Sequence, residues 1–173
     1  KHPGIRAAFC FNKETVKLTR GHNDANILIL IKGNPENEEW MAIFDATPFD
    51  GGRHQTRLDL ISGIEQEAAG QPQAQAVKNA LPQTIAIASD HSVLVLKAEV
   101  KQELEALGWT VFDLGTDSTA SCHYPNFGAA VARMVHSGQA ALGVVMCTTG
   151  IGISIVANRF MNVRCALCHT SEQ

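Results

Sequence analysis

The sequence predicts an α/β fold with three layers, in which helices cover both faces of a parallel sheet. Short apolar runs rich in β-branched residues alternate with longer segments of helical periodicity along the chain. Parallel strands need crossover connections, and the helical segments between the strand patterns supply them. A length of 173 residues with 45% hydrophobic content suits about one well-buried domain.

The first part of the chain contains two strand patterns and three helical patterns. The apolar runs 5-IRAAFC-10 and 26-NILILI-31 have the length of buried strands. Between and after them, apolar residues recur with helical spacing, and the last such segment is amphipathic. We expect helices at residues 13–20, 36–46 and 53–69.

The second part alternates strand and helix without interruption. Its strand patterns are 84-TIAIAS-89, 109-WTVFDL-114, 141-ALGVVMC-147 and 163-VRCALC-168. The helical patterns between them cover residues 92–107, 125–137 and 151–160. Each strand–helix–strand unit of this kind places its two strands parallel in one sheet.

The end of the chain nearly repeats its beginning. The segment 163-VRCALCHTSEQ-173 aligns with 5-IRAAFCFNKET-15 as a strand, a cysteine and a polar turn. Between the halves, 70-GQPQAQAVKNALPQ-83 has the composition of a connector. This order is typical of a circularly permuted domain or of a slice across two tandem copies. A sheet has one position for the repeated strand, so we expect one copy to be exchanged with, or buried against, a partner chain.

Composition excludes several classes of partner. A net charge of −3 and a pI of about 6.2 give no basic field for nucleic acid or anionic membranes. No apolar run approaches the roughly 18 residues of a membrane span, and no signal-peptide core is evident. Five cysteines, most of them in apolar runs, favour free thiols over a disulfide framework. We expect a cytoplasmic protein with no nucleic-acid or membrane partner.

Two cofactor patterns can be set aside. The segment 165-CALCH-169 matches the C-x-x-C-H pattern of covalent haem attachment. It lies inside a strand pattern, however, and its copy at residues 7–11 lacks the first cysteine and the histidine. The possible zinc ligands do not form two properly spaced pairs. We therefore expect neither a metal nor an organic cofactor.

Cys147 stands at the most informative position in the sequence. It ends an apolar strand and precedes a glycine-containing turn that opens a helix, in 144-VVMCTTGIGISIVAN-158. Ligands bind at this edge of open α/β sheets, and the amides from Thr148 to Gly152 would be free to hold an anion there. The positive end of the helix dipole would favour the thiolate. A buried structural cysteine before an ordinary turn is the alternative.

Three other polar motifs have both a functional and a structural interpretation. Asp90 and His91 follow a predicted strand at the same sheet edge, although Asp90 is also typical of a helix N-cap. Arg53 and Arg57 are four residues apart and share a helix face, which suits a phosphate or simply a solvated charged surface. The segment 22-HNDAN-26 precedes a strand and is either a polar turn or a binding element.

Taken together, the motifs resemble those of the ribose-5-phosphate isomerase B family, which includes galactose-6-phosphate isomerase subunits. In this chain they read SDH, HYP, CTTGIGISIVAN, RCALCH, HNDAN and GGRHQTR. Residues 84–173 resemble the first two-thirds of a family member and residues 4–69 resemble the rest, with 70–83 as a linker. The resemblance implies a Rossmann-like fold in circularly permuted order.

The resemblance also implies a function, the isomerisation of an aldose phosphate to a ketose phosphate through an enediol. Ribose 5-phosphate and ribulose 5-phosphate are the expected pair. By this resemblance Cys147 is the base, His22 opens the sugar ring as an acid, and the Thr149 hydroxyl holds the enediolate. The residues implied to bind substrate are Asp90, His91, Tyr124, Thr148, Gly150, Ile151, Gly152, Asn23, Arg53 and Arg57.

Alternatives remain at this stage. The chain departs from the family pattern at Thr148, where glycine is usual, at His123, where aspartate is usual, and at Gly33, where a phosphate-binding arginine is common. A hexose-6-phosphate isomerase and a catalytically silent sugar-phosphate-binding subunit are therefore alternatives. The resemblance implies a homodimer or higher homo-oligomer with shared active sites, in which His22 and Asn23 reach Cys147 across the interface.

Overall fold

The computed structural model describes residues 2–70 and 83–170, so the expected connector lies almost entirely outside the described residues. The N-terminal half contains β1 (Ala7–Phe9), α1 (Lys13–Asn23), β2 (Ile27–Ile29), α2 (Asn37–Ala46) and α3 (Arg53–Gly70). The C-terminal half contains β3 (Thr84–Ser89), α4 (Leu94–Ala106), β4 (Thr110–Asp113), α5 (Tyr124–Ser137), β5 (Leu142–Met146) and α6 (Ile151–Ala157). Among the described helices, none combines the length and the apolar character needed to cross a membrane.

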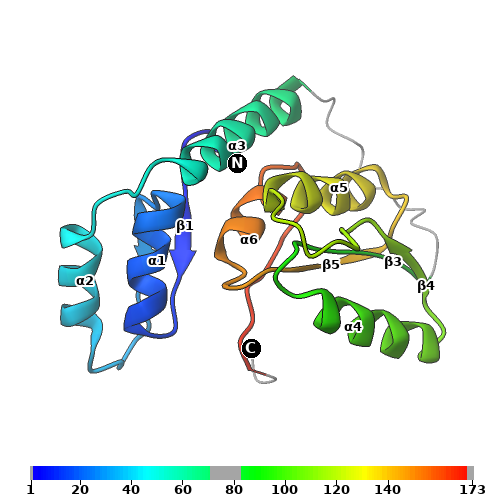
Figure 1. Ribbon diagram of the computed structural model, residues 1–173, viewed down its shortest axis with the longest axis horizontal. Helices are drawn as coiled ribbons and strands as arrows, with labels where there is room; N and C mark the ends of the chain where they lie inside the picture. The colour runs from blue at the N-terminus through cyan, green and yellow to red at the C-terminus, as the bar shows by residue number, and fades with distance from the viewer. Residues whose placement is uncertain (1, 71–82, 171–173) are drawn as a thin grey trace.

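The C-terminal half is built around a parallel sheet in the order β4-β3-β5. The central strand β3 is buried along its whole length, because each of its faces meets a helix. Ile85 and Ile87 pack on the side of Val100 in α4, whereas Ala86 and Ala88 pack on the side of α5. Figure 1 shows α4 and α5 on opposite sides of this sheet. The predicted three-layer arrangement is confirmed here.

The N-terminal half forms a second, smaller parallel ladder in which β1 pairs with β2 from Ala7 opposite Ile27 to Phe9 opposite Ile29. Its helix α1 begins where the sequence suggested, because Asn12 and Thr15 form a reciprocal capping box. The helix is longer than predicted, however, and ends only at Asp24, which adopts a left-handed conformation. His22 and Asn23 therefore lie in the last turn of a helix rather than in a polar turn.

One hydrophobic core joins the two halves. Ala8 and Val16 from the N-terminal half belong to the same buried cluster as Ile153, Val156 and Phe160 from the C-terminal half. The two ladders remain separate, but α6 lies between them (Figure 1). The halves therefore pack as one body along α6.

The predicted strand at 163–168 is wrong, since the structure forms a strand from only one of the two repeated segments. Residues 5–10 supply β1, whereas 163–168 follow a non-strand path. The Asn158 side chain holds this path, because it donates to the Cys165 carbonyl at 2.8 Å and accepts from the Cys165 amide at 3.0 Å. A cavity of about 650 Å³ is lined by β5 and by residues 162–168.

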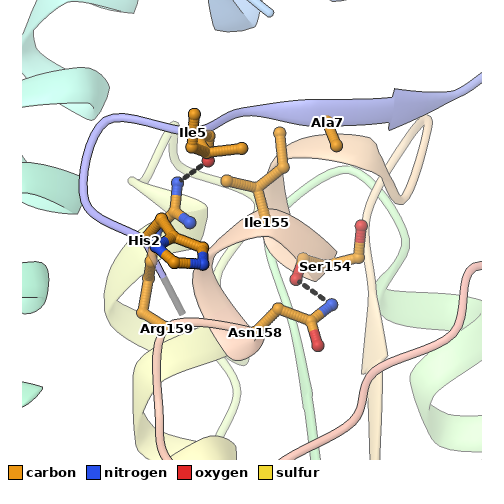
Figure 2. A pocket seen from close by; sticks show the side chains of 7 residues that line it. All are labelled: His2, Ile5, Ala7, Ser154, Ile155, Asn158 and Arg159. Carbon is orange, nitrogen blue, oxygen red and sulfur yellow. Dashed lines mark hydrogen bonds between the residues drawn. The ribbon is translucent and has the colours of Figure 1, made fainter. Parts of the chain in front are cut away.

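Charged contacts close the seam between the halves. Arg159 pairs with Glu65 at 2.7 Å, and both side chains are almost buried, with 9% and 11% of their surfaces exposed. Arg159 also donates to the Ile5 carbonyl. Figure 2 shows Arg159 and His2 beside a cavity of about 260 Å³ where β1 meets α6. A second pair, Arg133 with Glu67, links α5 to α3.

The close approach of α5 to the sheet gives a testable prediction. A Cβ atom on Gly143 in β5 would lie 2.6 Å from Val131 Cγ1, and backbone lies on its other side. Replacement Gly143→Ala should therefore destabilise the protein by about 1–3 kcal/mol through overpacking. Within the described ranges, no atom lies within 4 Å of the Cβ position of Gly63 in α3, so the control Gly63→Ala should stabilise the protein, by about 0.5–1 kcal/mol. Urea unfolding measures both, and equal effects would contradict this packing.

Candidate active site

Cys147 follows β5 directly, and the turn after it folds back over its sulfur. Gly150 adopts a left-handed φ of 71° and precedes α6. This conformation lets the Gly150 amide donate to Cys147 Sγ at 3.2 Å. The next amide, of Ile151, donates to Thr149 Oγ1 at 3.4 Å. The glycine that the turn requires is thus Gly150, two residues before Gly152.

The departure at Thr148 fits this turn without backbone strain. Among the described residues, the non-glycine positions with positive φ are Asp24, Gln83 and Asn162, so Thr148 has an ordinary backbone. Its hydroxyl donates to Ser92 Oγ at 2.9 Å. The threonine side chain therefore ties the cysteine turn to the loop after β3.

The expectation of a thiolate-favouring site is wrong. Burial raises the pKa of Cys147 above its ordinary value of 9.0, and the neighbouring Asp90 carboxylate raises that pKa further. Backbone hydrogen bonds from Gly150, Ile153 and Thr149 lower it only in part. Desolvation outweighs the amides, so the thiol is protonated at neutral pH.

Asp90 belongs to the site rather than to a helix cap. The helix α4 starts after Val93, which excludes Asp90 as its N-cap. The carboxylate instead accepts from the Ser92 amide at 2.9 Å and from the Ser92 hydroxyl at 2.5 Å. Only 6% of the Asp90 surface is exposed. Its neighbour His91 is turned toward Cys122, whose amide donates to His91 Nδ1 at 3.3 Å.

The N-terminal half reaches this site through Tyr124. The Tyr124 hydroxyl donates to Asn23 Oδ1 at 3.0 Å, and both residues are buried. Gly152 makes room for this pair, since a Cβ atom there would lie 2.6 Å from Asn23 Oδ1. The Arg57 guanidinium lies over the Tyr124 ring, 5.3 Å from its centroid. Asn23 thus meets Tyr124 within a single chain, and the expected sharing of the site between subunits stays a prediction.

Burial also fixes the protonation state of Tyr124. Its pKa is raised well above the ordinary value of 10.0, chiefly by burial, while the Arg57 charge lowers it. Cys147 and Asp90 add to the rise, which places both groups within electrostatic reach of the phenol. Tyr124 is therefore a neutral hydrogen-bond donor at physiological pH.

A second cluster of polar side chains surrounds His22. Its imidazole stacks on that of His54, with centroids 4.1 Å apart and planes 12° apart. His22 Nε2 lies 3.6 Å from Asp50 Oδ2. Burial lowers the pKa of His54 to about 4, with His22, Arg57 and Arg53 adding to the shift. The pKa of His22 is also lowered, mainly by burial, so both rings are neutral at pH 7.

Most of the predicted site residues therefore form one connected set. Direct contacts or electrostatic interactions link four of them, namely Cys147, Asp90, Tyr124 and Asn23. Arg57 extends this set, because it also approaches His54. Arg53 is exposed at the first residue of α3 and acts on the histidines through its charge.

The predicted set omitted three residues that the structure brings into the site. Ser92 links Asp90 to Thr148, Cys122 contacts His91, and Asp50 contacts His22. Ser92 and Asp50 each lie within two residues of a recognised motif, and this adjacency is the signal that would have found them. Cys122 carries the same signal, since it directly precedes the HYP motif.

Comparison with known proteins identifies the family. The sequence matches the Ribose/Galactose Isomerase family over residues 1–61 and 85–173. The chain therefore belongs to this family of sugar-phosphate isomerases, and its α/β architecture agrees with that membership.

Individual relatives match about half of the chain. It is 46% identical over 83 residues to the galactose-6-phosphate isomerase subunit LacB of Clostridium acetobutylicum, covering 48% of each protein. It is 39% identical over 84 residues to ribose-5-phosphate isomerase B of Escherichia coli, covering 49% of this chain and 56% of that one. The crystal structure of a ribose 5-phosphate isomerase from Thermotoga maritima is 42% identical, with a TM-score of 0.51 over 53% of this chain and 63% of that one. The chain spans about half the length of the curated relatives it matches.

The protonated state of Cys147 can be tested by alkylation. Only the thiolate reacts with iodoacetamide, and the pKa of Cys147 is raised, so its alkylation should stay slow near neutral pH and accelerate beyond pH 9.0. Mass spectrometry of the Cys147 peptide gives the rate from about pH 7 to about pH 10. The exposed Cys168 in the same sample controls for reagent quality. A Cys147 rate that is already at its plateau near neutral pH would contradict a raised pKa.

Proposed function

We propose that the chain is an aldose–ketose isomerase that interconverts ribose 5-phosphate and ribulose 5-phosphate through an enediol. One observation carries the proposal. The partly buried thiol of Cys147 and the Arg57 guanidinium of α3 both act on Tyr124, Arg57 by ring contact and Cys147 through its charge. A sugar phosphate has the matching chemistry, a weakly acidic C–H at one end and a dianion at the other.

Cys147 is the base of the proposed reaction. Its thiolate removes the proton from C2 of the open-chain aldose, and the electron pair of that bond passes into an enediolate on O1. The O2 proton moves to O1, and the sulfur returns its own proton to C1 as the O2 oxyanion becomes the ketose carbonyl at C2. A thiol whose pKa is raised by burial is scarce as a thiolate but is a stronger base once formed.

The turn after Cys147 supplies donors for the enediolate. The Thr149 oxygen accepts from the Ile151 amide, which leaves the hydroxyl proton of Thr149 for a substrate oxygen. The Gly150 amide already points at the sulfur, where negative charge develops when the thiol ionises. Donors fixed in place before the reaction stabilise charge without reorganising, which is the main source of catalysis in such sites.

Arg57 and Arg53 are the proposed phosphate ligands. Arg57 Nε is buried and has no hydrogen-bond acceptor among the described residues. A buried unpaired donor is costly, and a phosphate oxygen would satisfy it. The Tyr124 ring beneath the guanidinium restricts its motion. Arg53 lies one helical turn earlier, and its exposed side chain adds a second positive charge.

His22 is the proposed acid for ring opening. Its imidazolium form donates a proton to the ring oxygen. Burial makes this form a minor one at pH 7, and the Asp50 carboxylate, 3.6 Å from His22 Nε2, favours it. Asn23 follows His22 in α1, and its hydrogen bond with Tyr124 connects α1 to α5. Residues 4–69 and 84–173 thus act in this proposal as the two parts of one isomerase domain in permuted order.

A hexose 6-phosphate is the second candidate substrate. The 46% identity to a galactose-6-phosphate isomerase subunit favours it. It needs the same base, donors and phosphate ligands, so the two candidates differ only in substrate length.

Turnover of ribose 5-phosphate by the purified chain tests the proposal. We expect ribulose 5-phosphate to form, and we expect Cys147→Ala to lower kcat by at least about 100-fold because it removes the base. The matched control is Cys168→Ala, which removes an exposed thiol and should retain activity. Both variants should keep the wild-type circular dichroism spectrum.

The outcomes separate the candidates. Turnover of galactose 6-phosphate without turnover of ribose 5-phosphate would replace the proposed substrate by the hexose. Residual activity of Cys147→Ala within about tenfold of wild type, or about 1.4 kcal/mol in the barrier, would remove the thiol from the mechanism. If the folded chain binds sugar phosphates but turns over neither of them, it is a catalytically silent binding subunit.

A further inference from the structure

Three possible metal ligands converge beside the proposed phosphate site. His22 comes from the last turn of α1, Asp50 from the loop before α3, and His54 from the first turn of α3. One ligand atom from each lies within 4.8 Å of the other two. Two imidazole nitrogens and one carboxylate oxygen are a ligand set that binds Zn²⁺ and leaves a fourth position for water.

The backbone holds Asp50 and His54 in place. The Asp50 amide donates to the Gly21 carbonyl at 3.0 Å. Gly21 also makes room for the carboxylate, because a Cβ atom there would lie 2.9 Å from Asp50 Oδ2. His54 is 6% exposed, and its amide donates to the Gly51 carbonyl at 3.0 Å.

The orientation of His54 leaves one nitrogen for a metal. Arg57 approaches His54 Nδ1 at 3.5 Å, so Nε2 is the atom left to coordinate. The sequence spacing does not reveal this cluster, because residues 22, 50 and 54 do not form the two spaced ligand pairs of a zinc motif. Only the packing of α1 against α3 brings them together.

The surrounding charges set how strongly the cluster can bind a cation. Asp50 contributes one negative charge, while Arg53 and Arg57 act electrostatically on both histidines from the same helix. These guanidiniums oppose a divalent cation. The cluster is therefore suited to reversible binding rather than to a permanent structural metal.

We propose that His22, Asp50 and His54 form a regulatory site for Zn²⁺ or a similar divalent cation, and that the bound ion inhibits isomerisation by occupying His22. The inhibition rests on the proposed function. The binding does not. It rests on three ligand atoms that lie within 4.8 Å of one another, and it requires the His22 ring to turn out of its stack on His54, because two parallel rings cannot both direct an in-plane nitrogen at one ion.

Titration with Co²⁺ tests the binding. Thiolate coordination of Co²⁺ gives strong near-ultraviolet bands that imidazole and carboxylate ligands lack, so the spectrum separates this cluster from the five cysteines. We expect one Co²⁺ per chain without a thiolate band, displaced by Zn²⁺. Asp50→Asn and His54→Gln should each weaken binding at least about tenfold. The control His2→Ala, at an exposed histidine, should leave it unchanged.

Three results would overturn the binding site: no saturable binding, a thiolate spectrum, or full affinity in both the Asp50→Asn and His54→Gln chains. Circular dichroism of each variant separates lost ligands from lost folding.

Inhibition is measured separately as the Zn²⁺ concentration that halves activity, with reversal by a chelator. We expect this concentration to rise in Asp50→Asn by the same factor as the metal dissociation constant. Unchanged inhibition in a variant that no longer binds Co²⁺ would place the inhibitory ion elsewhere. A chain without isomerase activity refutes the proposed function but leaves the Co²⁺ result standing.

Discussion

The contact of Gly152 with Tyr124 and Asn23 is the constraint on which the rest of the site depends. A Cβ atom at Gly152 would lie 2.6 Å from Asn23 Oδ1 and would overlap the Tyr124 ring. These residues lie on α6, α5 and α1, so one contact fixes the N-terminal half against the cysteine turn. The positions of His22 and Arg57 relative to Cys147 follow from it, because each lies on or beside an element that packs at this seam.

Both apolar and charged contacts hold the N-terminal half against the C-terminal half. The shared core that includes Ala8 and Phe160 removes apolar surface from water and supplies most of the stabilisation. The nearly buried pair of Arg159 and Glu65 contributes little net stability, because desolvation of both ions offsets their attraction. We infer that such ion pairs fix the relative position of the two halves, which an apolar interface alone would not define.

The sequence predicted what depends on local pattern. The strand at residues 84–89 is predicted because it is an apolar run, and the start of α1 follows from helical spacing, where the structure shows Asn12 as the cap. Residues 163–168 have the apolar pattern of a strand but do not form one. The Asn158 side chain binds the backbone of this segment at Cys165 and holds it on a non-strand path. The shift in the pKa of Cys147 was predicted in the wrong direction, because burial beside Asp90 depends on the tertiary structure. The contact of Asp50 with His22 also depends on the tertiary structure, so the sequence alone did not predict it.

The central claim is that one chain supplies both parts of the site, and subunit complementation tests it most directly. Chains carrying Cys147→Ala and Asn23→Ala are unfolded together, refolded as an equal mixture, and compared with each variant refolded alone. Because Asn23 meets Tyr124 within one chain, the mixture should show only the mean of the two separate activities. Recovery to about a quarter of wild-type activity, the value for random pairing into dimers with exchanged halves, would contradict the account.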